Sequence, residues 1–164
     1  MTGEAAKPAK ITAAQGRRMR SAARFYAVQA LFQMEAADVG LETVRTEFET
    51  HRLGAEIDGV AYAEADLDHF RALLAATVEH QGRIDQLTDR ALVARWPIDR
   101  IDPTLRALFR AAGAELIATD TPPKVTINEY VDVAKAFYPD GKEAKFVNGV
   151  LDHMAREVQP KAFA

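Results

Sequence analysis

Apolar residues recur every three or four positions along most of the 164-residue chain, as they do on one face of an amphipathic helix. No stretch shows the sustained alternation of apolar and polar residues that is typical of a half-buried strand. The pattern therefore predicts an all-α protein with seven helices and no sheet. In the first half it indicates helices at about 18–37, 41–48 and 66–81, and a fourth that runs from about 84 to near Trp96 and Pro97, with a loop around 54–59 and a break or kink at Gly82.

The second half has clearer boundaries. Asp102 followed by Pro103 places a side-chain acceptor at a helix N-cap and a proline at the first helical position. Thr126 and Glu129 have the T-x-x-E spacing of a capping box, which predicts another helix start. The last helix is expected after the turn at 139–141. Seven amphipathic helices with short connections indicate a helical bundle.

Charge is distributed unevenly along the chain. Residues 1–24 hold six basic side chains and one acid, whereas residues 25–164 hold 15 bases and 23 acids. Residues 35–68 are the most acidic stretch, with ten acids and two bases, and they form either a solvated face or a surface for a basic partner. We interpret residues 1–16 as a flexible basic arm and residues 17–160 as a single helical domain.

The residue types that support catalysis or metal binding are sparse. The chain has no cysteine, its only serine is Ser21, and its four histidines lack the spacing of a metal site. There is no glycine-rich phosphate loop and no apolar run long enough to span a bilayer. We therefore expect a cytoplasmic protein that is not an enzyme, with no catalytic residues, no metal and no cofactor.

An arginine cluster near the N-terminus is the strongest chemical signal. On a helix, Arg17, Arg20 and Arg24 lie within roughly 60° of one another. Cations at a helix N-terminus oppose the helix dipole by about 0.3–1 kcal/mol each, so their repetition here suggests an anionic ligand. Arginine suits phosphates because its planar fork donates two parallel hydrogen bonds. From these residues alone, a nucleic-acid site and a merely soluble basic tail remain equal alternatives.

Three segments resemble a known family. The stretch TINEYVDVAKAFYPDGKEAKFVNGVLDHM resembles the most characteristic part of the NusB family. Upstream, RWPIDRIDPTLRALFRAAGAEL and RRMRSAARFYAVQALFQME are similar to two further family segments. The resemblance covers about residues 17–158.

The resemblance implies a fold, partners and site residues. The fold would be the seven-helix NusB-like fold, in which two small helical bundles pack together. The partners would be single-stranded boxA-type RNA, the ribosomal protein NusE and, indirectly, the RNA polymerase elongation complex. The implied partner-binding residue is Phe32, whose surface would otherwise suit a homodimer. The implied RNA-binding residues are Arg17, Arg18, Arg20, Arg24, Lys145, Phe146 and Asn148.

Other interpretations stay open at this point. An exposed aromatic and an amide suit single-stranded RNA, which is read by stacking and by hydrogen bonds to base edges. Phe146 could instead be a core residue, and Asn148 a buried structural amide. The whole chain could also be a protein-interaction bundle, or resemble the RNA-binding part of an RNA cytosine methyltransferase. That enzyme, however, needs a glycine-rich cofactor domain and cysteine chemistry.

Overall fold

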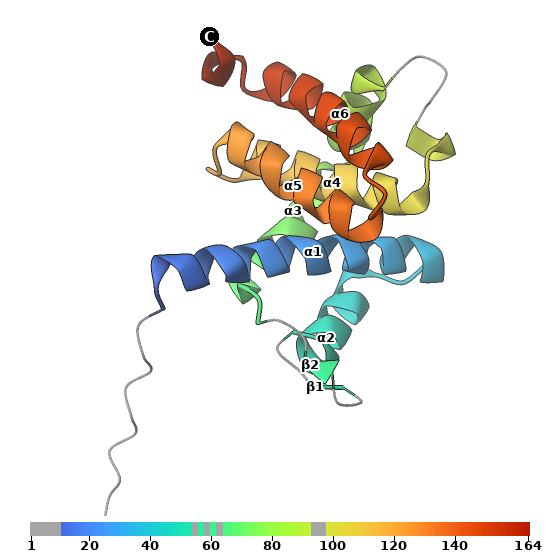
Figure 1. Cartoon of the computed structure of the whole chain (residues 1–164). Coiled ribbons are helices and arrows are strands. Elements are labelled where there is room, and N and C mark those ends of the chain that lie inside the picture. The colour runs from blue at the N-terminus through green and yellow to red at the C-terminus, as the bar shows by residue number, and fades with distance from the viewer. Residues whose placement is uncertain (1–10, 54–55, 58–59, 62–63, 93–97) are drawn as a thin grey trace, which may run out of the picture.

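We analysed a computed structural model that describes residues 11–53, 56–57, 60–61, 64–92 and 98–164 (Figure 1). Six α-helices account for most of these residues. Their bounds are α1 Ala13–Ala37, α2 Leu41–His51, α3 Leu67–Ala91, α4 Pro103–Ala118, α5 Pro123–Phe137 and α6 Lys142–Val158. The shorter elements are β1 Glu56–Ile57, β2 Val60–Ala61 and the 3₁₀ helices η1 Ile98–Arg100 and η2 Pro160–Phe163.

The all-helical prediction is confirmed in class, with two differences in detail. The expected third and fourth helices are one helix, α3, which is kinked at His80, two residues before the break or kink expected at Gly82. A glycine inside a helix costs only about 1 kcal/mol, so Gly82 did not have to end it. The prediction of no sheet is wrong, because β1 and β2 form a two-residue antiparallel pair with Ile57 opposite Val60. Strands this short cannot show alternation in the sequence.

The helices form two groups that share α3. In Figure 1, α1 crosses the middle of the molecule, with α2 and the short hairpin on one side and α4, α5 and α6 on the other. Buried side chains from all six α-helices join in one apolar cluster. Gly113 lets α4 approach α3 closely, since a Cβ there would lie 2.6 Å from Ile84 Cγ2. No helix in the described ranges is both long and apolar enough to cross a membrane.

The start of α1 differs from its prediction. Thr12 is the N-cap, its hydroxyl accepts from the Gln15 amide at 3.1 Å, and the Gln15 side chain accepts from the Thr12 amide at 2.8 Å. This capping box begins the helix at Ala13, so residues 13–16 are helical rather than part of an arm. Residues 1–10 of the predicted arm lie outside the described residues. Arg17 and Arg18 consequently lie beyond the first turn, where the dipole penalty has faded.

The predicted start of α4 is confirmed, whereas that of α5 is wrong. Asp102 caps α4 by accepting a hydrogen bond from the Thr104 amide at 2.7 Å. Helix α5 begins at Pro123, because a proline at the first turn is already set to a helical φ. Thr126 is therefore buried inside the helix and caps nothing, and Glu129 turns toward α1.

Candidate nucleic-acid interface

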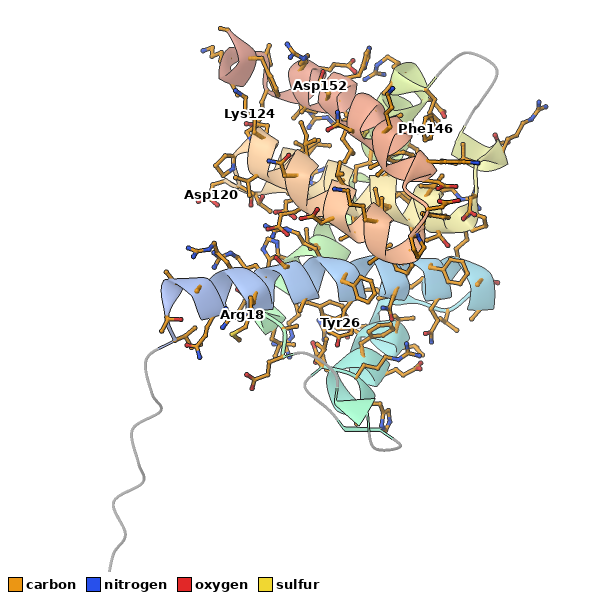
Figure 2. All side chains as sticks on the ribbon, in the orientation of Figure 1. Arg18, Tyr26, Asp120, Lys124, Phe146 and Asp152 are labelled. Atoms are coloured by element: carbon orange, nitrogen blue, oxygen red, sulfur yellow. The ribbon has the colours of Figure 1, made fainter. Side chains whose placement is uncertain are left out.

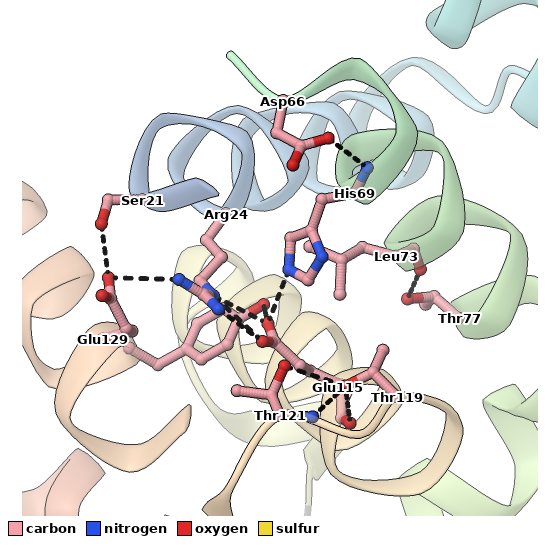
Figure 3. A network of polar contacts seen from close by, with 11 residues as sticks. Ser21, Arg24, Asp66, His69, Leu73, Thr77, Glu115, Thr119, Thr121 and Glu129 are labelled. Atoms are coloured by element: carbon pink, nitrogen blue, oxygen red, sulfur yellow. Dashed lines mark hydrogen bonds and ion pairs between the residues drawn. The ribbon is translucent and has the colours of Figure 1, made fainter. Parts of the chain in front are cut away.

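A buried ionic cluster joins α1 to α4. Arg24 of α1 is 3% exposed, and its guanidinium Nη2 lies 2.7 Å from Oε2 of Glu115, which is fully buried in α4. The Arg24 Nε also donates to both Glu115 oxygens, at 2.9 and 3.1 Å. The Tyr130 hydroxyl of α5 donates to Glu115 Oε1 at 3.0 Å, and His69 Nε2 of α3 lies 3.3 Å from the same oxygen (Figure 3). One carboxylate thus ties four helices together.

The electrostatics of this cluster favour the charged pair. Burial alone would raise the pKa of the Glu115 carboxyl, but the neighbouring His69 and Arg24 side chains outweigh it and lower that pKa from 4.5 to about 2. Burial, together with the same carboxylate, raises the pKa of the Tyr130 phenol well above its usual value of 10. Glu115 is therefore an anion in the folded protein, and Tyr130 is a neutral hydrogen-bond donor.

Glu129 connects the buried cluster to the surface. Its Oε2 lies 3.5 Å from Arg24 Nη1 and accepts a hydrogen bond from the Ser21 hydroxyl at 2.8 Å. Figure 3 shows Ser21 and Arg24 reaching this carboxylate from consecutive turns of α1. Two acids, Glu115 and Glu129, are thus both engaged by Arg24.

A polar groove opens beside this cluster, between the N-terminal half of α1 and the turn that joins α4 to α5. Its volume is about 540 Å³. Arg17 and Arg20 line it, and within the described part of the chain neither forms an ion pair. The remaining lining residues are Arg24, His69, Thr119, Asp120, Thr121, Pro122, Val125 and Glu129.

The predicted arginine cluster is therefore divided by the fold. Arg17, Arg20 and Arg24 do share one face of α1, as their spacing predicts, and all three line the groove. Arg24 is nevertheless a core residue whose guanidinium is used by Glu115 and Glu129, so we leave it out of the RNA contacts implied by the resemblance. Arg18 is exposed but does not line the groove.

The second predicted group, on α6, lies elsewhere. Lys145, Phe146 and Asn148 are all exposed near the start of α6, and none of them lines the groove. In Figure 2, Phe146 lies toward one end of the molecule, whereas Arg18 and Asp120 lie toward the other. Phe146 is 37% exposed, and its ring meets the buried Phe109 ring edge-on, with centroids 6.1 Å apart.

These three side chains also do not converge on one point. Residues two apart on a helix lie on different faces, so Phe146 and Asn148 point away from each other with Lys145 between them. Asn148 is not the buried amide that was the alternative, and Phe146 is only partly a packing residue. An RNA strand that touches both must pass across α6.

An apolar hollow of about 340 Å³ lies beside the C-terminal half of α1. Phe32 is 39% exposed there, and Phe137 of α5 and Arg52 form further parts of the lining. Arg52 sits 4.7 Å from the centre of the Phe48 ring, which keeps its charged head at the edge of the hollow. The predicted partner residue Phe32 therefore lies far along α1 from the arginines.

Several groove and cluster residues were missed by sequence reasoning, namely His69, Glu115, Tyr130 and the turn at 119–122. One signal was available for Glu115, since it stands in the otherwise apolar run AAGAEL. A charged residue on the buried face of a helix usually has a buried partner of opposite charge. The identity of that partner depends on how the helices pack, which the spacing does not give.

These features define a class of protein. It is a small helical bundle with the polar groove at the N-terminal half of its first helix and the apolar hollow at the C-terminal half. The sequence model of the NusB family matches residues 21–156. The chain therefore belongs to the NusB family. The groove arginines Arg17 and Arg20 lie just before the matched range.

Named relatives and solved structures agree with this assignment. The chain is 49% identical to the transcription antitermination protein NusB of Mesorhizobium japonicum over 141 residues, covering 85% of this chain and 90% of the relative. It is 50% identical to the protein of the same name from Brucella abortus over 137 residues, covering 83% and 80%.

Among solved structures, NusB of T. maritima has a TM-score of 0.69 and 31% identity, covering 88% of this chain and 96% of that one. A structure of the antitermination factors NusB and NusE in complex with double-stranded RNA has a TM-score of 0.68 and 26% identity, covering 85% and 98%.

Proposed function

We propose that the protein is an RNA-binding transcription antitermination factor, which acts with NusE on boxA-type RNA and supports processive transcription of ribosomal RNA. The observation that carries the proposal is that Arg17 and Arg20 line a groove and form no ion pair with any residue that the structure describes, in a chain whose relatives are named antitermination proteins. Binding, rather than bond chemistry, is the proposed activity. Its site of action is the cytoplasm, where nascent bacterial RNA is made.

The phosphates of RNA suit the arginine-bearing half of α1. Arg17, Arg18 and Arg20 project from a single turn of the helix, so a strand that follows the helix end meets each of them. Contacts to phosphate position an RNA but do not read its sequence. We assign sequence reading to Phe146 and Asn148, with Lys145 as a neighbouring phosphate contact.

The hollow around Phe32 suits the protein partner. An exposed aromatic in an apolar depression is a typical anchor of a protein interface. Glu47 of α2 accepts a hydrogen bond from Gln33, which lines the hollow, and its charge would attract a basic ribosomal protein such as NusE. RNA polymerase is then reached indirectly, through the assembled RNA–NusE complex. In the free protein the same hollow would serve a homodimer.

The experiment that tests this function measures the affinity for a boxA-type strand with and without NusE, using a scrambled strand of equal length as the control. We expect NusE to increase the affinity for the boxA-type strand more than for the scrambled one, because the two proteins would capture the RNA together. If neither strand binds even when NusE is present, the protein is an interaction bundle without an RNA function.

A further inference from the structure

The groove beside Arg17 and Arg20 has a second wall, which is not helical. It consists of the turn at 119–122 between α4 and α5, followed by Val125 on the first turns of α5. Nothing in the arginine pattern points to this turn, which lies about a hundred residues later in the chain. Figure 2 shows Asp120 and Arg18 at the same end of the molecule, with α1 and the turn facing each other.

The turn is held in place by its own hydrogen bonds. The Thr119 hydroxyl donates to the Glu115 carbonyl at 2.8 Å, and the Thr121 amide donates to the Thr119 hydroxyl at 3.3 Å. Pro122 and Pro123 follow, and each has a fixed φ. Since Glu115 is also the centre of the buried cluster, the second wall is anchored to the same residue of α4 that binds Arg24. A ligand entering the groove therefore meets two walls that need little reordering.

The charges in the groove favour an anion, with one exception. The Glu129 carboxylate is engaged by Arg24 and Ser21, as described above. Arg17 and Arg20 are left as cations with no ion pair among the described residues. The other acid that lines the groove is Asp120. It is exposed and forms no ion pair with the residues that the structure describes.

We propose that the RNA backbone passes through this groove, so that one phosphate lies between Arg17 or Arg20 and the turn at 119–122. The inference rests on the proposed function and specifies where the strand runs. A volume of about 540 Å³ lies within the range of about 300–1,000 Å³ that is typical of sites for small ligands. Asp120 then repels the phosphates and limits the capture of any RNA by charge alone.

The absence of cysteine from the chain allows a direct test. Val125 lines the groove and is 43% exposed, whereas Val78 of α3 is 47% exposed and does not line it. We compare the alkylation rates of the Val125→Cys and Val78→Cys variants in the presence of NusE, each with and without saturating boxA-type RNA. RNA should slow alkylation at position 125 by at least about fivefold, because thiol reactivity follows exposure, and should change it little at position 78.

A second set of variants changes the charge at the rim of the groove. Asp120→Asn should raise the RNA affinity about two- to fivefold, and Asp120→Lys should raise it further and steepen the salt dependence by about 0.7 in log–log slope. Asp38→Asn is the matched control, since Asp38 lies at the opposite end of α1 in a left-handed conformation that asparagine also tolerates. It should leave the affinity unchanged.

The outcomes separate this inference from the proposed function. If RNA binds but slows alkylation at position 125 no more than at position 78, or if Asp120→Lys has no more effect than Asp38→Asn, the strand does not pass through the groove. The proposed function would then still stand. If no RNA binds under any condition, the function itself fails.

Discussion

The two halves of α1 carry different chemistry on one continuous helix. The N-terminal half brings Arg17 and Arg20 to a polar groove, whereas the C-terminal half brings Phe32 to an apolar hollow. Arg24 lies between them and is buried against Glu115. The same residue type, arginine, thus faces an open groove at two positions and is a core residue at a third, according to which helices cover it. The following predictions test how separate the two halves are.

The largest effect is expected where α1 is anchored. Arg24→Ala leaves Glu115 as a buried anion without its arginine partner, so it should lower the free energy of unfolding by about 3–5 kcal/mol. Arg17→Ala, on the exposed part of the same helix face, should change it by less than about 0.5 kcal/mol. Urea denaturation of both variants measures this difference. Equal effects would show that Arg24 is not part of the core.

The stability that the buried Arg24–Glu115 pair contributes should also depend on pH. The pKa of Glu115 is about 2 in the folded protein and 4.5 in the unfolded chain. The ionised carboxylate therefore stabilises the folded state fully above about pH 4.5. This stabilisation is lost as the pH falls from about 4.5 toward 2, by an amount on the order of 3 kcal/mol. The stability difference between the wild-type protein and Glu115→Gln should shrink across that window. Glu42→Gln, an exposed control on α2, should show no such change. A constant difference between wild type and Glu115→Gln would contradict the ionic role.

The residues on α6 should affect recognition rather than general affinity. Phe146→Ala and Asn148→Ala should each weaken binding of a boxA-type strand by about 1–3 kcal/mol, the usual contribution of one stacked base, and barely change binding of a scrambled strand. Because the two side chains lie on different faces of α6, their effects should be independent in the double variant. Competition binding, with a thermal melt of each variant, provides the measurement. Equal weakening of both strands would make this helix start structural.

The smallest expected effect concerns the aromatic half of α1. Phe32→Ala should weaken NusE binding by at least about 1 kcal/mol, as the truncation of an exposed aromatic anchor does, and should leave the salt dependence of RNA binding unchanged. Calorimetric titration with NusE measures it. A decrease in folding stability of similar size, with NusE affinity retained, would instead place Phe32 in the core.

The features that the sequence predicts correctly are those that depend on local pattern. The amphipathic period indicates the helices, and Asp102 with Pro103 marks the start of α4. The Thr12–Gln15 capping box is equally local, but the apolar periodicity begins only after it, and a prediction based on periodicity places the start of α1 five residues too late. The proline pair at 122–123 ends one helix and begins the next, which the apparent capping box at Thr126 conceals.

The candidate site was predicted only in part, because it is made of contacts between distant segments. Helical spacing put Arg17, Arg20 and Arg24 on one face, but it did not show that Glu115, 91 residues away, covers only the last of them. The turn at 119–122 carries no sequence signal of its own as a groove wall. Its position depends on how α4 packs against α1, which is a property of the folded core.

The central claim is that the arginines near the start of α1 bind RNA phosphates, and the salt dependence of RNA affinity tests it most directly. We compare the wild-type protein with the Arg17→Gln/Arg18→Gln/Arg20→Gln triple variant, with NusE present, and use Arg83→Gln, an exposed arginine of α3 outside the groove, as the control. The triple variant should bind more weakly, and its log–log slope should flatten by about 0.7 for each phosphate that the protein no longer neutralises. Arg83→Gln should keep the wild-type slope. A triple variant with unchanged affinity and unchanged slope would contradict the account.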